Sequence, residues 1–573
     1  MARRRAFFIG LLVGSASLPS YAQDAGSLLR EQQRQQDLQR LERLPQPEES
    51  RPRPVPAVGP ENGETIVVRD LRFTGKVELL PAAKRASIIA ADKGKRLGIS
   101  GIKAIADEVT IAIQARGRML GYAVLPPQDI TEGVVTIHIL EGKLERIEFE
   151  RKSGVRIREE LLSGIASSRV QPDGLEKQDL EDALLRMNDL PGVSARAKLV
   201  PGATPQSSRL VIDVEQQPIV SAAAWGDNYG NASTGEAESS AQLTLTDLTG
   251  YGDQTRLGGT FSEGQQFGQA NVSMPLWASG FTANANYQYL TYRDRDDLGK
   301  ALGLEGHAHF VGFGLDYSLI RSRDLNVRLS ETLNWKALVD DSVVGRLQNK
   351  RSISETFAVS GDMRDGLFGG GLTSWSLGWT FGNLDLSRVE SALAVDQLGL
   401  QTQGGFHRLN ASFARLQKLP GDFSLFARLY GQWASKNLDS SEDFALGGPY
   451  GVRGYPVGEG RGDMGLLETI ELRYDAPIPP AWGQVQLATF LDAGQVRINR
   501  FQNGVPTLNE CGCNAYGLAS TGLSARWTRE NVSLSVTWAH TLGDNPGRSV
   551  FTDANVDGKT SSQQVWLQGT IRF

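Results

Sequence analysis

The chain has 573 residues, too many for one ordinary domain and enough for a large barrel with attached domains. Its formal net charge of −5 argues against a nucleic-acid partner, because proteins that bind nucleic acids carry a basic surface. Its 64 glycines favour strands and turns over helix bundles, and its two cysteines, Cys511 and Cys513, are too few to hold the fold together.

Residues 1–22 are predicted to be an export signal peptide. Three arginines, Arg3 to Arg5, precede an apolar run from Ala6 to Gly14, and the small-residue site Ser20-Tyr21-Ala22 follows. The run has about half of the ~20 apolar residues that a transmembrane helix needs. No later segment offers ~18 apolar residues, so a membrane form of the protein would have to span the bilayer with strands.

Residues 24–44 are predicted to form a helix, since they include no proline and many good helix formers. A sparse stripe of leucines, Leu28, Leu38 and Leu41 with Leu29 as a further candidate, interrupts the polar side chains. Such a helix cannot join an apolar core, so it is either a solvated spacer or the occupant of a water-filled space. The next segment, residues 45–63, has six prolines and is predicted to be an extended linker.

Two units of similar order follow, residues 64–142 and 143–218. Each has the predicted order β-α-α-β-β, which an ordinary small α+β domain could also show. In the first unit we expect a strand from Ile66 to Thr74, helices near Pro81–Ala91 and Ile102–Leu120, and a strand over Gly133–Leu140. In the second unit we expect these elements: strand Leu144–Glu150, helices Val155–Ser167 and Leu175–Asn188, and strands Val193–Val200 and Arg209–Glu215. Such units offer an edge strand to which an unfolded segment can add.

Residues 219–573 lose the helical period and alternate apolar with polar residues. In the run from Val532 to Ala539, for example, Val, Leu, Val and Trp alternate with Ser, Ser, Thr and Ala. A soluble sandwich would bury the apolar face, whereas an outer-membrane barrel turns it toward lipid. The export signal favours a closed transmembrane barrel, with about sixteen antiparallel strands at one per ~22 residues. The last run ends on an aromatic residue, Phe573.

A long glycine-rich loop, residues 444–465, interrupts the strands. Eight glycines occur between Gly447 and Gly465, around the tetrad Val452-Arg453-Gly454-Tyr455, which is too many for a helix or strand interior. Downstream, Phe490-x-Asp492-x-Gly494 lies in an alternating run in which Asp492 shares the less apolar face. A loop of this length in an ordered protein is usually functional.

The inventory of motifs predicts no enzyme. The sequence has no G-x-S-x-G, no nucleotide-binding P-loop and no H-E-x-x-H, so we expect no catalytic residue, no cofactor and no nucleotide. The five histidines show no metal-ligand spacing, and we expect no metal. Cys511 and Cys513 could close a small ring in an oxidising compartment or remain free.

The tetrad, the F-x-D-x-G strand and the terminal Phe573, in this order, resemble the superfamily of POTRA domains followed by an outer-membrane β-barrel. Within it, the chain resembles the two-partner secretion transporters that export haemolysins and adhesins. Further features carry this resemblance: Gly121-Tyr122, Pro126 and the ending Glu141-Gly142 in the first unit, Asp227-Asn228-Tyr229-Gly230 at the start of the barrel, and Glu471-Leu472-Arg473-Tyr474 after the loop. The departures are Leu491 before Asp492, and the cysteine loop.

The resemblance implies a plug helix at 24–44, two POTRA domains at 64–142 and 143–218, and a sixteen-stranded barrel at 219–573 with the loop folded into its lumen. Arg453 would then pair with Asp492, whose lumenal phase the alternation supports, and Glu471 is a possible second acceptor. The chain would reside in a Gram-negative outer membrane with periplasmic POTRA domains. There the barrel-assembly machinery would recognise the Phe573 end, and the transporter would secrete an unfolded partner exoprotein without ATP. The alternatives are a barrel-assembly insertase of the same superfamily or a passive, porin-like channel.

Overall fold

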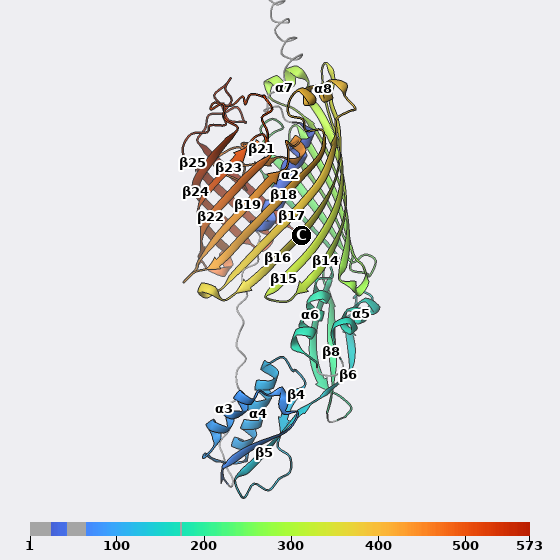
Figure 1. The fold of residues 1–573 in the computed structure, drawn as a ribbon, viewed down its shortest axis with the longest axis vertical. Helices are drawn as coiled ribbons and strands as arrows, with labels where there is room; N and C mark the ends of the chain where they lie inside the picture. The colour runs from blue at the N-terminus through green and yellow to red at the C-terminus, as the bar shows by residue number, and fades with distance from the viewer. Residues whose placement is uncertain (1–23, 43–64, 172–174, 205) are drawn as a thin grey trace, which may run out of the picture.

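The computed structural model describes residues 24–42, 65–171, 175–204 and 206–573 (Figure 1). The predicted signal peptide 1–22 and linker 45–63 lie outside the described residues. Among the described helices, none is long and apolar enough to cross a bilayer.

The first α+β unit packs two helices on a three-stranded sheet. In this sheet β5 pairs parallel with β2 and antiparallel with β4, and a small second sheet joins β1 to β3. Apolar side chains such as Ile88, Val109 and Ile137 form the core. The elements are β1 (Ile66–Val67), β2 (Asp70–Gly75), α3 (Ala82–Asp92), β3 (Arg96–Leu97), α4 (Ile99–Ala115), β4 (Gly121–Val124) and β5 (Val134–Glu141).

Two predicted boundaries in this unit are wrong. The single strand expected from Ile66 to Thr74 is two strands, because the chain changes sheets between Val67 and Asp70: Val68 bonds to Lys95, and Arg69 bonds to Gly133. The helix expected to reach Leu120 ends at Ala115. It ends there because Gly117 takes a φ of +96°, a left-handed conformation that continues no helix.

The second α+β unit repeats the sheet order. Its strand β8 pairs parallel with β6 and antiparallel with β7. The helix expected from Val155 begins only at Glu159, because Gly154 takes a φ of +89° and Arg158 is extended, with its N–H bonded to Gly250 of the barrel at 2.9 Å. The elements are β6 (Lys143–Arg151), α5 (Glu159–Arg169), α6 (Lys177–Asn188), β7 (Val193–Pro201) and β8 (Ser207–Gln216).

Residues from Val220 onward form a closed antiparallel barrel of sixteen strands, which confirms the predicted barrel (Figure 1). Alternating side chains face outward and inward; Leu523 and Val536 are 58% and 47% exposed outside, whereas Ser520 is buried inside. The strands are β9 (Val220–Asp227), β10 (Glu238–Thr246), β11 (Gln254–Phe261), β12 (Gln265–Pro275), β13 (Phe281–Arg293), β14 (Glu305–Arg321), β15 (Leu325–Ser342), β16 (Gly345–Asp365), β17 (Gly371–Asp385), β18 (Gly404–Lys418), β19 (Phe423–Ala434), β22 (Met464–Ala476), β23 (Gln484–Arg497), β24 (Ala515–Arg529), β25 (Val532–Thr541) and β26 (Gln563–Arg572).

The barrel closes where β26 pairs with β9. The terminal residue Phe573 adds to this seam, because its N–H and carbonyl both bond to Ala222, at 2.8 and 3.1 Å. The second α+β unit leads directly into β9, so the end of the barrel at which β9 begins is called the domain end. The opposite, far end carries the short helices α7 (Asp297–Leu302) and α8 (Glu390–Leu398) (Figure 1).

The second α+β unit touches the barrel at the domain end, where Ala278 of a barrel turn packs against the core of the unit and polar pairs add to the contact. Arg321 of β14 binds Asp189 at 2.6 Å, and Arg186 of α6 donates to the Ser318 carbonyl at 3.1 Å. These contacts involve turns and strand ends, and the sixteen-strand ladder is complete without them.

Helix α2 (Ala25–Glu42) lies inside the barrel (Figure 1). Of the two possibilities that its polar surface left open, the structure therefore has the helix in the lumen. Leu28 and Leu29 pack on inward apolar side chains of the wall, among them Phe267, Leu290 and Leu338. Its glutamines bond to polar wall residues: Gln33 to Gln288 at 2.9 Å, Gln32 to Glu238 at 3.3 Å and Gln36 to Gln269 at 3.4 Å.

Candidate functional site

The long connection between β19 and β22 folds back into the lumen. Its two arms pair as β20 (Phe444–Ala445) and β21 (Arg461–Gly462), and between them Val452 and Tyr455 are 0% and 1% exposed. Gly454 is required by close packing, because a Cβ there would lie 2.7 Å from the Cβ of Ser520 in β24. The glycines that the sequence concentrates here therefore let the loop backbone approach the wall.

Arg453 is the centre of a buried ion network on β22 and β23. Its Nε and Nη2 donate to the two carboxylate oxygens of Asp492 at 2.8 and 3.0 Å, and its Nη1 donates to Glu471 at 2.9 Å. Its guanidinium also lies over the Phe490 ring, with Cζ 3.3 Å from the ring centroid. The structure thus brings Arg453, Asp492, Glu471 and Phe490 together, with Asp492 fully buried. A planar guanidinium shared by two carboxylates is a strong and directional anchor.

Neighbouring side chains fix this network in place. Thr469 donates to Asp492 at 3.0 Å, and Arg473 donates to Glu471 at 2.7 Å. Trp566 of β26 donates its indole N–H to the Arg453 carbonyl at 2.8 Å. Gly494 allows the loop to pass, since a Cβ there would lie 2.4 Å from a methyl group of Leu446. The loop tip is therefore tied to three strands of the wall, β22, β23 and β26.

Helix α2 contacts the same loop. Arg34 donates to the carbonyls of Ala445 and Gly447 at 3.0 and 2.8 Å. Leu38 packs in the apolar cluster that contains Val452 and Tyr455. The helix and the loop therefore fill the lumen as one packed unit.

Arg428 joins the end of the helix to the loop and to the ion network. It is 2% exposed, pairs with Glu42 at 3.3 Å, and donates to the Tyr450 carbonyl at 2.7 Å and to Thr469 at 3.1 Å. Motif reasoning missed this residue. The alternation of β19, in which Arg428 lies between the inward residues Phe426 and Tyr430, was the available signal that it faces the lumen.

The start of the helix is held near the far end by a second buried set that the sequence reading missed. Lys350 of β16 binds Asp24 at 2.8 Å and Asp439 at 2.7 Å. The N–H of Ala25 donates to Asp340 at 2.8 Å. Two partners that are 326 positions apart in the sequence meet here, so no local pattern indicates the pairing.

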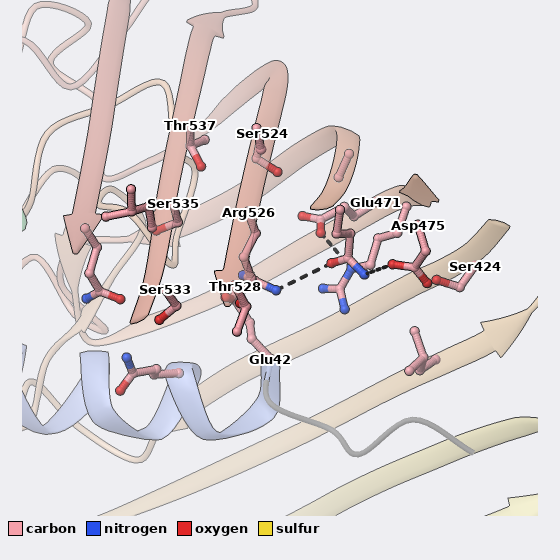
Figure 2. A pocket seen from close by; sticks show the side chains of 18 of the residues that line it. Glu42, Ser424, Glu471, Asp475, Ser524, Arg526, Thr528, Ser533, Ser535 and Thr537 are labelled. Atoms are coloured by element: carbon pink, nitrogen blue, oxygen red, sulfur yellow. Dashed lines mark hydrogen bonds and ion pairs between the residues drawn. The ribbon is translucent and has the colours of Figure 1, made fainter. Parts of the chain in front are cut away.

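Beneath the loop, toward the domain end, lies a polar cavity of about 670 Å³. Hydroxyl side chains of β24 and β25 line one wall, and Glu471 and Asp475 of β22 face them (Figure 2). Glu42, at the end of α2, and Arg453 border the same cavity. The lumen is therefore open from the domain end up to the helix and the loop.

The residues predicted from the first α+β unit lie elsewhere. Gly121 packs on α4, where a Cβ would lie 2.3 Å from a methyl group of Ile113. Glu141 pairs with Arg118 at 3.5 Å, and the N–H of Gly142 bonds to Leu120 at 2.9 Å. Tyr122 lies half-buried in β4, and Pro126 follows that strand. These residues shape the unit and its junction with the next, and none of them joins the lumenal site.

At the far end, the loop between β23 and β24 contains a disulfide between Cys511 and Cys513. It closes a short ring within one surface loop. It lies apart from the lumenal site.

Two protein-family models match parts of the chain. Residues 206–519 match the family model described as haemolysin secretion/activation protein ShlB/FhaC/HecB, and residues 66–142 match the POTRA domain of ShlB type. The chain is 27% identical over 488 residues to the heme/hemopexin transporter protein HuxB of Haemophilus influenzae (strain 86-028NP), covering 84% of this chain and 82% of that protein. It is 22% identical over 489 residues to the outer membrane transporter CdiB of Dickeya dadantii (strain 3937), covering 84% of each.

Solved structures share the fold, among them the following two. CdiB from Escherichia coli superposes with a TM-score of 0.68 at 20% identity, covering 97% of this chain and 100% of that chain. BamA from Haemophilus ducreyi lacking POTRA domains 1–3 superposes with a TM-score of 0.56 at 12% identity, covering 89% of this chain and 100% of that chain.

Proposed function

Since the chain belongs to the ShlB/FhaC/HecB family of haemolysin secretion/activation proteins, we propose that it captures an unfolded partner exoprotein in the periplasm and secretes it through the barrel without ATP. The domain end of the barrel is its periplasmic end, and the far end faces outward from the outer membrane. The observation that carries this proposal is a polar lumen filled by a helix and a loop that are bonded to the wall and to each other, with a periplasmic domain of POTRA type beneath it. We assign the chain no catalytic role.

The second α+β unit, residues 143–218, serves in this proposal as a second POTRA domain. Its sheet order β6-β8-β7 repeats the order β2-β5-β4 of the first unit, with the same parallel and antiparallel pairs. Each sheet has two edge strands, and an unfolded client could add to one of them as a further strand. Backbone pairing of this kind reads no particular sequence, which suits a long unfolded client.

The periplasmic cavity is the proposed entrance for the client. Its lining combines hydroxyl groups with charges of both signs, such as Arg526 and Asp475 (Figure 2). A surface of this kind keeps an unfolded chain hydrated and offers no large apolar patch on which it would stick. Above the cavity α2 and the loop fill the lumen, so the helix must leave before a client can pass.

Energy for transport would come from folding of the client outside the cell. We expect purified protein in lipid vesicles to translocate an unfolded client in the absence of nucleotide and of an ion gradient. The measurement is protease protection of the client, with vesicles that hold the same protein without its 64–218 segment as the control. A strict need for ATP or for a proton gradient would contradict the mechanism, and equal transport by the protein without its 64–218 segment would favour a passive channel.

Loss of the Arg453 anchor should impair transport more than assembly. Breaking a buried ion pair costs ~3 to 5 kcal/mol, and hydration of the neighbouring cavity should reduce this value. We therefore expect Arg453→Ala to insert as a folded, heat-modifiable barrel. Its secretion of client should fall at least about tenfold if the substitution destabilises the active loop conformation by ~1.4 kcal/mol. Arg529→Ala, an exposed arginine at a periplasmic turn, is the matched control.

The pairing itself is tested by a double-mutant cycle on secretion. Arg453 has two carboxylate partners, so Asp492→Ala should cost less than Arg453→Ala. The double variant should be no worse than Arg453→Ala alone. Simple addition of the two effects would show that the contact between Arg453 and Asp492 has no part in transport.

A further inference from the structure

The outward face of strands β13 to β16 carries basic side chains near the outer end of the barrel. The register aligns Tyr289, His309, Ala337 and Arg351 in one row across these four strands. Odd-numbered residues on these strands face outward, as Phe313 and Leu333 show with exposures of 59% and 47%. Arg351 and His309 therefore project from the barrel and not into the lumen.

Aromatic residues place this row at the membrane interface. Tyr287 and Trp335 lie one step closer to the periplasm than the row, and they are 44% and 40% exposed on the outward face. Tyr and Trp on the outside of a barrel form the girdles that sit at headgroup level. Arg351 and His309 lie on the outer side of these aromatics, at the height of the outer-leaflet headgroups.

The contacts of this row leave its basic groups available. The Arg351 guanidinium lies over the Trp335 ring at 5.2 Å, and the His309 Nδ1 lies 2.9 Å from the Tyr287 hydroxyl, which leaves Nε2 as the free ring nitrogen. His307 packs against His309, with ring centroids 5.7 Å apart, and Arg388 is the charged neighbour of Arg351.

One acidic residue borders the row, because Asp385 of β17 is the cross-strand neighbour of Arg351 on the outward face. Other arginines of the outer rim have acidic partners, such as Arg346 with Asp341 at 2.8 Å. Arg388 is 4.0 Å from Asp385, and that carboxylate accepts the Ser387 N–H. Within the part of the chain that the structure describes, Arg351 belongs to no ion pair. Arg388 therefore has an acidic partner, whereas no described carboxylate lies within 4.0 Å of the Arg351 guanidinium.

We propose that Arg351, His309, His307 and Arg388 form a binding site, the outer-rim patch, for the phosphate groups of the phosphorylated glycolipid of the outer leaflet. A guanidinium is the side chain best matched to a phosphate, and a tryptophan beneath it holds it flat. The side chains directly below the patch, such as Ile353 and Trp335, are apolar and face lipid, so the acyl chains of the same molecule have a surface to lie on. Glu355 and Glu331 face outward one to two rows further toward the periplasm. A lumenal client could not reach the patch, because the patch lies outside the barrel. The proposal rests on the outer-membrane location and the strand direction, and it is independent of secretion.

Native mass spectrometry of the full-length protein in detergent tests the site. The probes are bis-phosphorylated lipid A, the same lipid with both phosphates removed, and phosphatidylglycerol. We expect bis-phosphorylated lipid A to bind wild type about tenfold more tightly than it binds Arg351→Gln, the effect of one charge-assisted contact. Arg497→Gln removes an outward arginine at the outer end of β23, on another side of the barrel, and should bind like wild type.

The other outcomes overturn the proposal. Equal binding of bis-phosphorylated lipid A to wild type and to Arg351→Gln would show that the proposed site does not bind it. Equal binding of the dephosphorylated and the bis-phosphorylated lipid to wild type would contradict the proposal in the same way. Binding of phosphatidylglycerol as tight as that of lipid A would mean a general anionic surface and not a glycolipid site. Heat-modifiability on gels confirms that each variant is folded. Secretion by Arg351→Gln is measured alongside, so that failure of this site and failure of the transport proposal are distinguishable.

Discussion

Deletion of residues 24 to 44 should raise the single-channel conductance of the protein in planar bilayers several-fold, while secretion largely persists. The helix fills the lumen and bonds to the wall along its length, through Lys350 near one end and Arg428 near the other. Without it, the periplasmic cavity would continue toward the outer end, and the loop would still be anchored by Arg453. An unchanged conductance would mean that the loop alone closes the pore.

A reversible lock provides the matched control. Gln33 and Gln288 are bonded at 2.9 Å through the ends of two long side chains, so cysteines at these two positions, joined by a thiol-reactive crosslinker that a reductant cleaves, should tie the helix to β13. Cys511 and Cys513 are replaced by serine in this background to exclude exchange with their disulfide. We expect low conductance and no secretion until a reductant is added. Secretion with the lock closed would show that the client passes a lumen that still holds the helix.

Deletion of residues 64 to 218 should abolish secretion and leave a folded barrel. The barrel should survive because its sixteen strands close through β9 and β26, whereas the second α+β unit contacts turns and strand ends, through Ala278 and through polar pairs such as Arg321 with Asp189. Secretion should be lost because the client would have no sheet edge to which it could add. The measurements are client in the medium and heat-modifiability of the barrel.

The control for this deletion separates capture of the client from opening of the pore. A variant that lacks both 24–44 and 64–218 should conduct ions but secrete no client. Normal secretion by either truncated protein would mean that the α+β units do not capture the client. Loss of the folded barrel would show instead that the docking pairs at the periplasmic end are needed for assembly.

The barrel could be predicted from the sequence because a period of two residues is a local property. The inward phase of Asp492 followed from that alternation, whereas its pairing with Arg453 came from a resemblance, and the structure places the two side chains in contact. The helix ends at Ala115 and Glu159 were missed because they depend on single glycines with positive φ. The contact of Lys350 with Asp24 could not be predicted, since alternation gives the face of a residue but not its partner across the lumen.

The direction of helix α2 sets how it can be pulled out. Its last residue, Glu42, borders the periplasmic cavity, and its first turn is bonded to Lys350 and Asp340 near the outer end. The α+β units follow the helix in the chain, so a tug from the periplasm acts along the helix axis. Such a force loads all the contacts along the helix, from Asp24 to Glu42, in parallel, so these contacts must break together and not one after another. A weak, steady force should therefore leave the pore closed. Only a force large enough to break all the helix contacts together should release the helix. Thermal motion of the periplasmic domains would thus not open the resting channel.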